Sequence, residues 1–126
     1  MLSALAESPM KSVMRFVWVG AGLPEPLVNP EIFDPSGQFI ARVDLVDPET
    51  GLVGEHNGVW HRDGLQPWSD IVRQRPLEPW GFTLANLGGP DFARGAVDAA
   101  AELSTKWLSL RASGGHPHPN VRICSR

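Results

Sequence analysis

The sequence predicts a small α/β protein with a mixed sheet, and three observations lead to this fold class. Apolar residues recur at helical spacing near both ends of the chain, at 10–21 and 93–110. Short apolar runs lie between them, separated by turn signals that are typical of short strands. The 126 residues also include 12 Pro and 13 Gly, which favours short elements. The predicted order is α-β-β-β-α-β-α, with an antiparallel β-meander formed by the three consecutive strands.

The first predicted helix covers about residues 9–21. Ser8–Pro9 supplies an N-cap followed by Pro in the first turn, and Gly22–Pro24 supplies the signals that end a helix. A shorter second helix is predicted from Pro67 through Val72, before two further prolines that a helix interior does not accept.

The last helix is predicted to begin after Asp91 and to end by Arg111. Its apolar stripe consists of Ala93, Val97, Ala100, Leu103, Trp107 and Leu110, and we expect Val97, Leu103 and Trp107 to pack against the sheet. We expect residues 1–8 to be a loose N-terminus and 9–111 to form a single domain. Residues 112–126 are expected to be a flexible tail because they are rich in Gly, Pro and charge.

The centre of the chain is predicted to hold the meander. A strand around Ile32–Phe33 is followed by the turn 34–37, with Pro second and Gly fourth, and then by a strand at 39–46. The turn 47–51, also marked by Pro and Gly, leads to a strand at 52–57. A fourth strand is predicted at 81–87. Because a helix precedes it, this strand can lie parallel to an earlier one.

Charge and cysteine content narrow the class of protein. The net charge of −3 and the pI near 5.7 indicate no general basic surface, so any nucleic-acid contact would have to be local. The single Cys124 forms no internal disulfide, which favours a reducing compartment. The chain shows no signal peptide and no apolar run that spans a bilayer. We therefore expect a cytoplasmic protein with no membrane partner.

Two carboxylates come near each other in the predicted hairpin. Asp44 lies inside the strand 39–46, and Glu55 lies near the end of the strand 52–57. Carboxylate oxygens that converge at the end of a sheet suit a hard cation such as Mg²⁺. The alternative is a pair of exposed strand residues bridged to Arg42 or Arg62. The sequence pattern leaves both interpretations open.

Five stretches resemble a known family when they are taken together. They are Ser8-Pro9-Met10-Lys11-Ser12, Ala21-Gly22-Leu23-Pro24, Phe33-Asp34-Pro35-Ser36-Gly37, Ala41-Arg42-Val43-Asp44-Leu45 and Glu55-His56-Asn57-Gly58-Val59-Trp60-His61-Arg62. In this combination the chain resembles the restriction-endonuclease-like fold, and more narrowly the domains related to the very-short-patch-repair DNA endonuclease. Many such domains occur in actinobacterial proteins. The resemblance covers about residues 8–110.

The resemblance implies a metal-dependent DNA endonuclease or nickase. By position, Asp44 and Glu55 would hold Mg²⁺, and His61 would act on the scissile phosphate or on its attacking water. Asn57 stands where relatives carry a second acid, and Lys11 stands near the position of a Glu in their first helix. Because both differences remove negative charge, the resemblance implies weak metal binding.

The alternative is a catalytically degenerate member of this fold. Such a module would bind DNA, a protein partner or a second copy of the chain in a regulatory or defence role. The two lost acids and the acidic pI favour this alternative. Aromatic rings can stack on bases, although they more often cover a core or a protein interface. The candidate contacts with nucleic acid or a partner are Lys11, Arg42, Trp60, Arg62 and Trp68.

Overall fold

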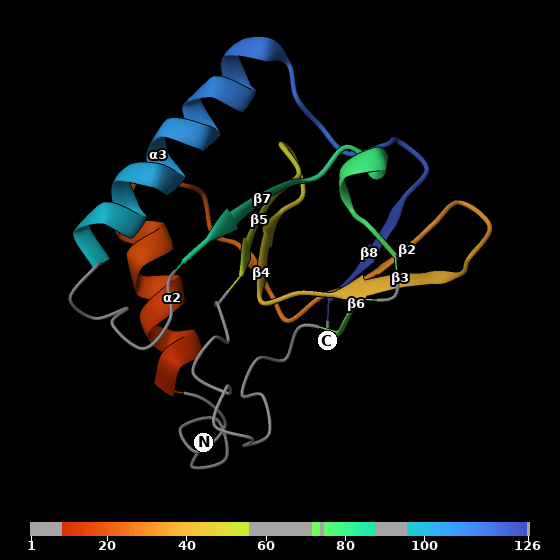
Figure 1. Cartoon of the computed structure of the whole chain (residues 1–126), viewed down its shortest axis with the longest axis horizontal. Helices are drawn as coiled ribbons and strands as arrows, with labels where there is room; N and C mark the ends of the chain where they lie inside the picture. The colour runs from red at the N-terminus through yellow and green to blue at the C-terminus, as the bar shows by residue number, and fades with distance from the viewer. Residues whose placement is uncertain (1–8, 56–71, 74, 88–95, 126) are drawn as a thin grey trace.

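A computed structural model describes residues 9–55, 72–73, 75–87 and 96–125, and within them it shows two α-helices and two four-stranded sheets. The helices are α2 (Pro9–Gly20) and α3 (Ala96–Ser113). The first sheet has the order β1-β4-β5-β7 and the second has the order β6-β3-β2-β8. The strands are β1 (Leu27–Val28), β2 (Glu31–Phe33), β3 (Phe39–Arg42), β4 (Leu45–Asp47), β5 (Leu52–Glu55), β6 (Val72–Arg73), β7 (Thr83–Asn86) and β8 (Arg122–Cys124). Figure 1 shows both helices on one side of β4, β5 and β7, with β2, β3 and β8 on the other side.

Helix α2 forms where its apolar spacing predicted it. Met14, Val17 and Trp18 are buried, and their spacing of three and one places them on one face. Gly22 adopts the left-handed φ of 94° that commonly ends a helix. The indole N–H of Trp18 donates to the carbonyl oxygen of Pro24 at 2.8 Å, which fixes the chain as it leaves the helix.

Helix α3 is also confirmed, and Ala100, Leu103, Trp107 and Leu110 of the predicted stripe pack in or against the first core cluster. Leu103 is fully buried and Trp107 is partly buried against the same cluster, as expected. Val97 is 80% exposed, so its predicted packing is wrong. Ala99 is buried on this face, and it is separated from Val97 by two residues, which is about 200° around the helix. No helix in the described part of the chain is long and apolar enough to cross a membrane.

A single long hairpin connects the two sheets. The pairs Val28↔Leu45 in β1–β4 and Glu31↔Arg42 in β2–β3 follow the same antiparallel register. Between them, the backbone N–H of Asn29 donates to the oxygen of Asp44 at 2.7 Å. The strand predicted at 39–46 is therefore split into β3 and β4 at a kink, and it passes from one sheet into the other.

The predicted pairings of the first sheet are confirmed. β4 and β5 pair antiparallel across the turn at 48–51, and β5 pairs parallel with β7. The turn closes through a hydrogen bond from the N–H of Gly51 to the oxygen of Asp47 at 2.8 Å, with Gly51 at a φ of 79°.

Two apolar clusters form the core. The first contains residues of α2 and α3 together with the helix-facing residues of the first sheet: Met14, Val17, Trp18, Leu23, Leu45, Leu52, Ala85, Leu87, Ala99 and Leu103. The second joins the opposite face of that sheet to the second sheet: Ile32, Ile40, Ala41, Val43, Val46, Val53, Leu77 and Phe82. The first sheet is thus covered by apolar side chains on both faces.

The predicted second helix is wrong in its described part. Val72 and Arg73 form strand β6, which pairs antiparallel with Arg42 and Ala41 of β3. Residues 67–71 lie outside the described residues. Backbone pairing with the open edge of β3 replaces the hydrogen bonds that a helix would have supplied. The chain then forms only a short 3-10 helix, η2 (Glu78–Trp80).

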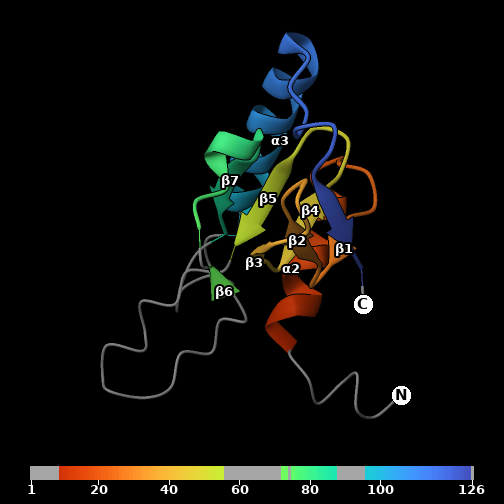
Figure 2. The same ribbon diagram turned by 90° about the vertical axis from the view of Figure 1, so that its right-hand side faces the viewer.

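The C-terminal segment, expected to be flexible, is instead paired and packed. β8, the dark blue arrow in Figure 2, adds to the free edge of β2. The register of this pair places Ile123 opposite Ile32. The N–H of His118 donates to the oxygen of Trp80 at 2.8 Å. The side chains of Val121 and Ile123 pack partly buried against the second cluster. The two apolar residues and the open strand edge together explain why this Pro-rich segment is held.

Candidate functional site

A row of polar residues crosses one end of the first sheet. The parallel ladder pairs Glu55, the last residue of β5, with Asn86, the last residue of β7. The antiparallel ladder ends with Leu45 opposite Gly54, and Asp44 and Glu55 are the next residues beyond that pair. The hydrogen bond from Asn29 to the oxygen of Asp44 continues this line to the end of β1. We call Asn29, Asp44, Glu55 and Asn86 the polar row.

The alternation of side chains decides which face Glu55 and Asn86 occupy. Gly54 faces the helices, since a Cβ added to it would lie 3.2 Å from the Trp18 ring. Ala85 belongs to the same helix-facing cluster. Successive residues of a strand point to opposite faces, so Glu55 and Asn86 fall on the face turned away from α2 and α3. The two side chains therefore share one face at the strand ends.

The polar row runs from the interior to the surface. Asp44 is only 2% exposed and lies at the bend between β3 and β4. Glu55 is partly exposed, with its Oε2 atom buried, and Asn86 is exposed. Charges in such a partly dry setting interact more strongly with a cation than they would in water. The row therefore carries acid and amide groups from the exposed Asn86 to the buried Asp44.

Asn29 has two unusual properties. Its φ of 59° places a residue other than glycine in the left-handed region. Its side-chain oxygen Oδ1 is buried and accepts no hydrogen bond from the part of the chain that the structure describes. Such buried oxygens are rare and call for an explanation. Sequence reasoning passed over Asn29 because it lies in a Pro-rich connector, although the dipeptide Asn29–Pro30 is itself a turn signal.

The acidic pair was predicted to lie on two adjacent antiparallel strands, but only Glu55 lies in a strand, because Asp44 falls in the bend between β3 and β4. Glu55 ends β5, and Asp44 lies one residue before β4, the antiparallel neighbour of β5. Whether one cation reaches both carboxylates stays a prediction. Among residues 9–55, 72–73, 75–87 and 96–125, no three His, Cys, Asp or Glu side chains gather as a metal site. Further ligands from these described residues would be amide or backbone oxygens.

The other predicted site residues lie elsewhere or outside the described residues. Arg42 is the last residue of β3, is partly buried and stands opposite Glu31 in the ladder. Lys11 lies in the first turns of α2. Residues outside the described part of the chain are Asn57, Trp60, His61, Arg62 and Trp68, and their roles remain predictions.

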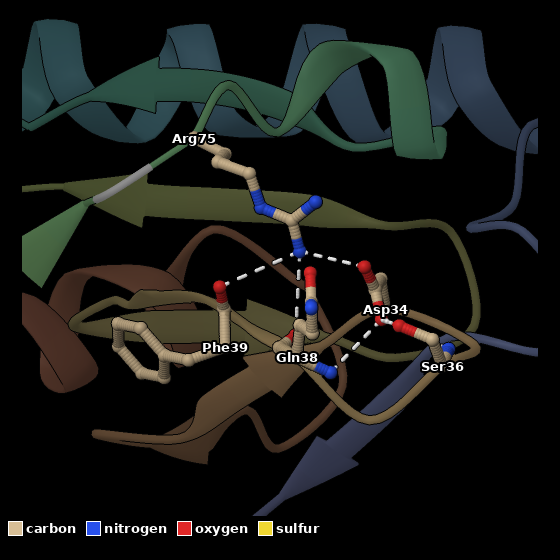
Figure 3. A network of polar contacts seen from close by, with 5 residues as sticks. All are labelled: Asp34, Ser36, Gln38, Phe39 and Arg75. Carbon is tan, nitrogen blue, oxygen red and sulfur yellow. Dashed lines mark hydrogen bonds and ion pairs between the residues drawn. The ribbon is translucent and has the colours of Figure 1, made fainter.

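A second group of polar contacts, shown in Figure 3, surrounds Asp34 at the turn between β2 and β3. Its Oδ1 accepts hydrogen bonds from the Ser36 hydroxyl at 2.6 Å and from the backbone N–H of Gln38 at 2.9 Å. Its Oδ2 accepts one from the Arg75 guanidinium at 2.7 Å. The Ser36 hydroxyl and then Arg75 hold the pKa of the Asp34 carboxyl well below its usual range. These contacts hold the turn between β2 and β3 and attach Arg75 to it, so their role is structural.

Two curated proteins of Mycobacterium tuberculosis are similar to this chain. They are uncharacterized protein MT2308 of strain CDC 1551 / Oshkosh and uncharacterized protein Rv2248 of strain ATCC 25618 / H37Rv. Each is 29% identical over 110 residues, which is 86% of this chain. The chain spans 40% of the length of these relatives. No family model matches the chain, and no solved structure matches it at a significant level.

Proposed function

We propose that this protein is a metal-dependent DNA endonuclease or nickase of the very-short-patch-repair-like type, with Mg²⁺ held by Asp44 and Glu55. The observation that carries the proposal is the neighbouring position of these two acids at the end of the first sheet. Mg²⁺ commonly uses one or two carboxylates and keeps several waters. A restriction-endonuclease-like fold is part of the proposal. It is supported by the order helix, antiparallel hairpins, parallel strand and helix.

Each residue of the site has a stated task in this proposal. Mg²⁺ supplies charge neutralisation at the phosphate and a more acidic bound water. Asp44 and Glu55 fix the position of the ion, and the burial of Asp44 strengthens its attraction for the cation. His61 accepts a proton from the attacking water or contacts the phosphate. Arg42 and Arg62 contribute positive charge towards the DNA backbone.

Cleavage of supercoiled plasmid tests the proposal. The unmodified protein should convert supercoiled DNA to the nicked form in Mn²⁺ or Mg²⁺, and Asp44→Ala and Glu55→Ala should abolish this. Asp98→Ala is a matched control, because Asp98 is an exposed acid in the first turn of α3. Nicking that survives in Asp44→Ala would reject the site.

The second candidate is a degenerate module of this fold that binds DNA or a protein partner without cutting. Lys11 and Asn57 favour it, because the family resemblance leads us to expect acidic residues at these two positions. Binding of a fluorescent DNA duplex without cleavage, measured by anisotropy in EDTA, would support the DNA-binding form. Size-exclusion chromatography with light scattering tests for a second copy of the chain.

A further inference from the structure

We propose that the side chain of Asn29 supplies a third oxygen ligand to the cation held by Asp44 and Glu55. This inference rests on the proposed function and deepens it. It assigns a ligand from the end of β1, a part of the chain for which neither the sequence pattern nor the resemblance indicated any role.

The first argument is the state of the Asn29 side chain. Its Oδ1 is buried and accepts no hydrogen bond from the described residues. A buried amide oxygen that lacks a donor loses its hydration without compensation. A hard cation is a natural partner for such an oxygen, because Mg²⁺ and Ca²⁺ take amide and carboxylate oxygens as ligands.

The second argument is distance. The backbone N–H of Asn29 lies 2.7 Å from the carbonyl oxygen of Asp44, so the two residues are immediate neighbours across the hairpin. The two side chains therefore start from backbone positions in direct contact. Mg²⁺ takes its oxygen ligands at about 2.0–2.1 Å, so it needs such closely spaced residues.

The third argument concerns the backbone at Asn29. A φ of 59° suits glycine best, and Asn is among the few other residues that adopt it readily. The left-handed conformation, together with Pro30, produces the kink at which the two sheets diverge. Asn therefore combines the required turn with an oxygen-bearing side chain beside Asp44. The oxygen would partly replace the ligand that is lost at Asn57.

Asn29→Gly separates these two roles. Glycine keeps the left-handed backbone and removes only the amide, so the variant should fold as the unmodified protein does. Mn²⁺ binding to the full chain, measured by calorimetry, should weaken about tenfold or more. Asn29→Asp should strengthen it, because it adds a charge while Asp also tolerates this conformation. Melting temperatures in EDTA show that each variant is folded.

The outcomes distinguish this inference from the function on which it rests. Equal Mn²⁺ affinity in Asn29→Gly and unmodified protein, with weaker binding in Glu55→Gln, would overturn the role of Asn29 and leave the acidic pair. Absence of Mn²⁺ binding by the unmodified protein would overturn both. If Asn29→Gly fails to fold, Asn29→Asp decides the matter, and unchanged affinity in that variant overturns the inference.

Discussion

The indole N–H of Trp107 in α3 donates a hydrogen bond to the buried carboxylate of Asp47, at 2.9 Å from its Oδ2. The same oxygen accepts a bond from the hydroxyl of Thr50 at 2.7 Å. The last helix is thereby tied to the turn between β4 and β5, the hairpin whose other end carries Asp44 and Glu55.

Replacing Trp107 by Phe tests this link. The ring would keep most of its packing, while Asp47 would lose a donor to a buried charge. We expect a loss of about 1.5–3 kcal/mol in the free energy of unfolding, measured with urea. Trp107→Ala should cost about 3–5 kcal/mol because packing is lost as well. Leu108→Ala, at the exposed neighbouring position, is the control and should change little. A loss in Trp107→Phe no larger than in this control would contradict the role of the bond.

The network at Asp34 predicts a pH dependence. The hydrogen bonds from Ser36 and Arg75 lower the pKa of Asp34 in the folded protein. Their stabilisation is therefore fully present above the pKa of an unfolded Asp, about 3.9, and is lost as the pH falls below it. Urea unfolding between pH 6 and pH 2 should show a smaller acid-side loss of stability in Asp34→Asn. Arg75→Gln should reduce the same loss in part. If both variants lose as much stability in acid as the unmodified protein, the network at Asp34 does not cause the pH dependence.

A substitution at Gly81 tests whether its close contact with the C-terminal segment holds that segment in place. A Cβ at this position would lie 2.6 Å from the oxygen of His116, and its φ is 89°. Gly37 has a similar φ of 92° but nothing within 4 Å of the same position. Both changes to Ala carry the backbone cost of about 1–2 kcal/mol. Only Gly81→Ala should also displace the segment, seen as faster proteolysis near the C-terminus. Equal effects of the two variants would mean that the contact is unimportant.

Restoring the acids predicted from the resemblance should improve metal binding. Asn57→Asp adds a carboxylate two residues after Glu55, so Mn²⁺ affinity measured by calorimetry should rise. Nicking of supercoiled DNA should rise with it, and Lys11→Glu should add to the effect. No gain in affinity from Asn57→Asp would favour the non-cutting module. Strong cleavage by the unmodified protein would instead show that the lost acids are dispensable.

Local patterns were sufficient for much of the fold. The helical spacing of Met14, Val17 and Trp18 predicted α2, and the Pro and Gly signals at 34–37 and 48–51 predicted both hairpin turns. These features depend on residues close together in the sequence, so propensity and alternation suffice to find them. The same patterns correctly predicted Glu55 near the end of a strand, but they put Asp44 inside a strand where the structure has a bend.

Contacts between distant segments could not be obtained in this way. β6 pairs with the open edge of β3, and β8 pairs with the open edge of β2. The residues next to Val72 and Ile123 in the sequence do not indicate these partners. The exposure of Val97 likewise depends on the surface against which α3 packs.

The sequence by itself determined the α/β class and the two hairpin turns, since both follow from the order of neighbouring residues. Only the tertiary structure decided that Asn29 and Asn86 join Asp44 and Glu55 in one row. The parallel pairing of β5 with β7 brings Asn86 to Glu55 from a distant part of the chain, and a backbone hydrogen bond joins Asn29 to Asp44. Such neighbours are fixed by strand register, which is set by the packing of both sheet faces and not by any local pattern.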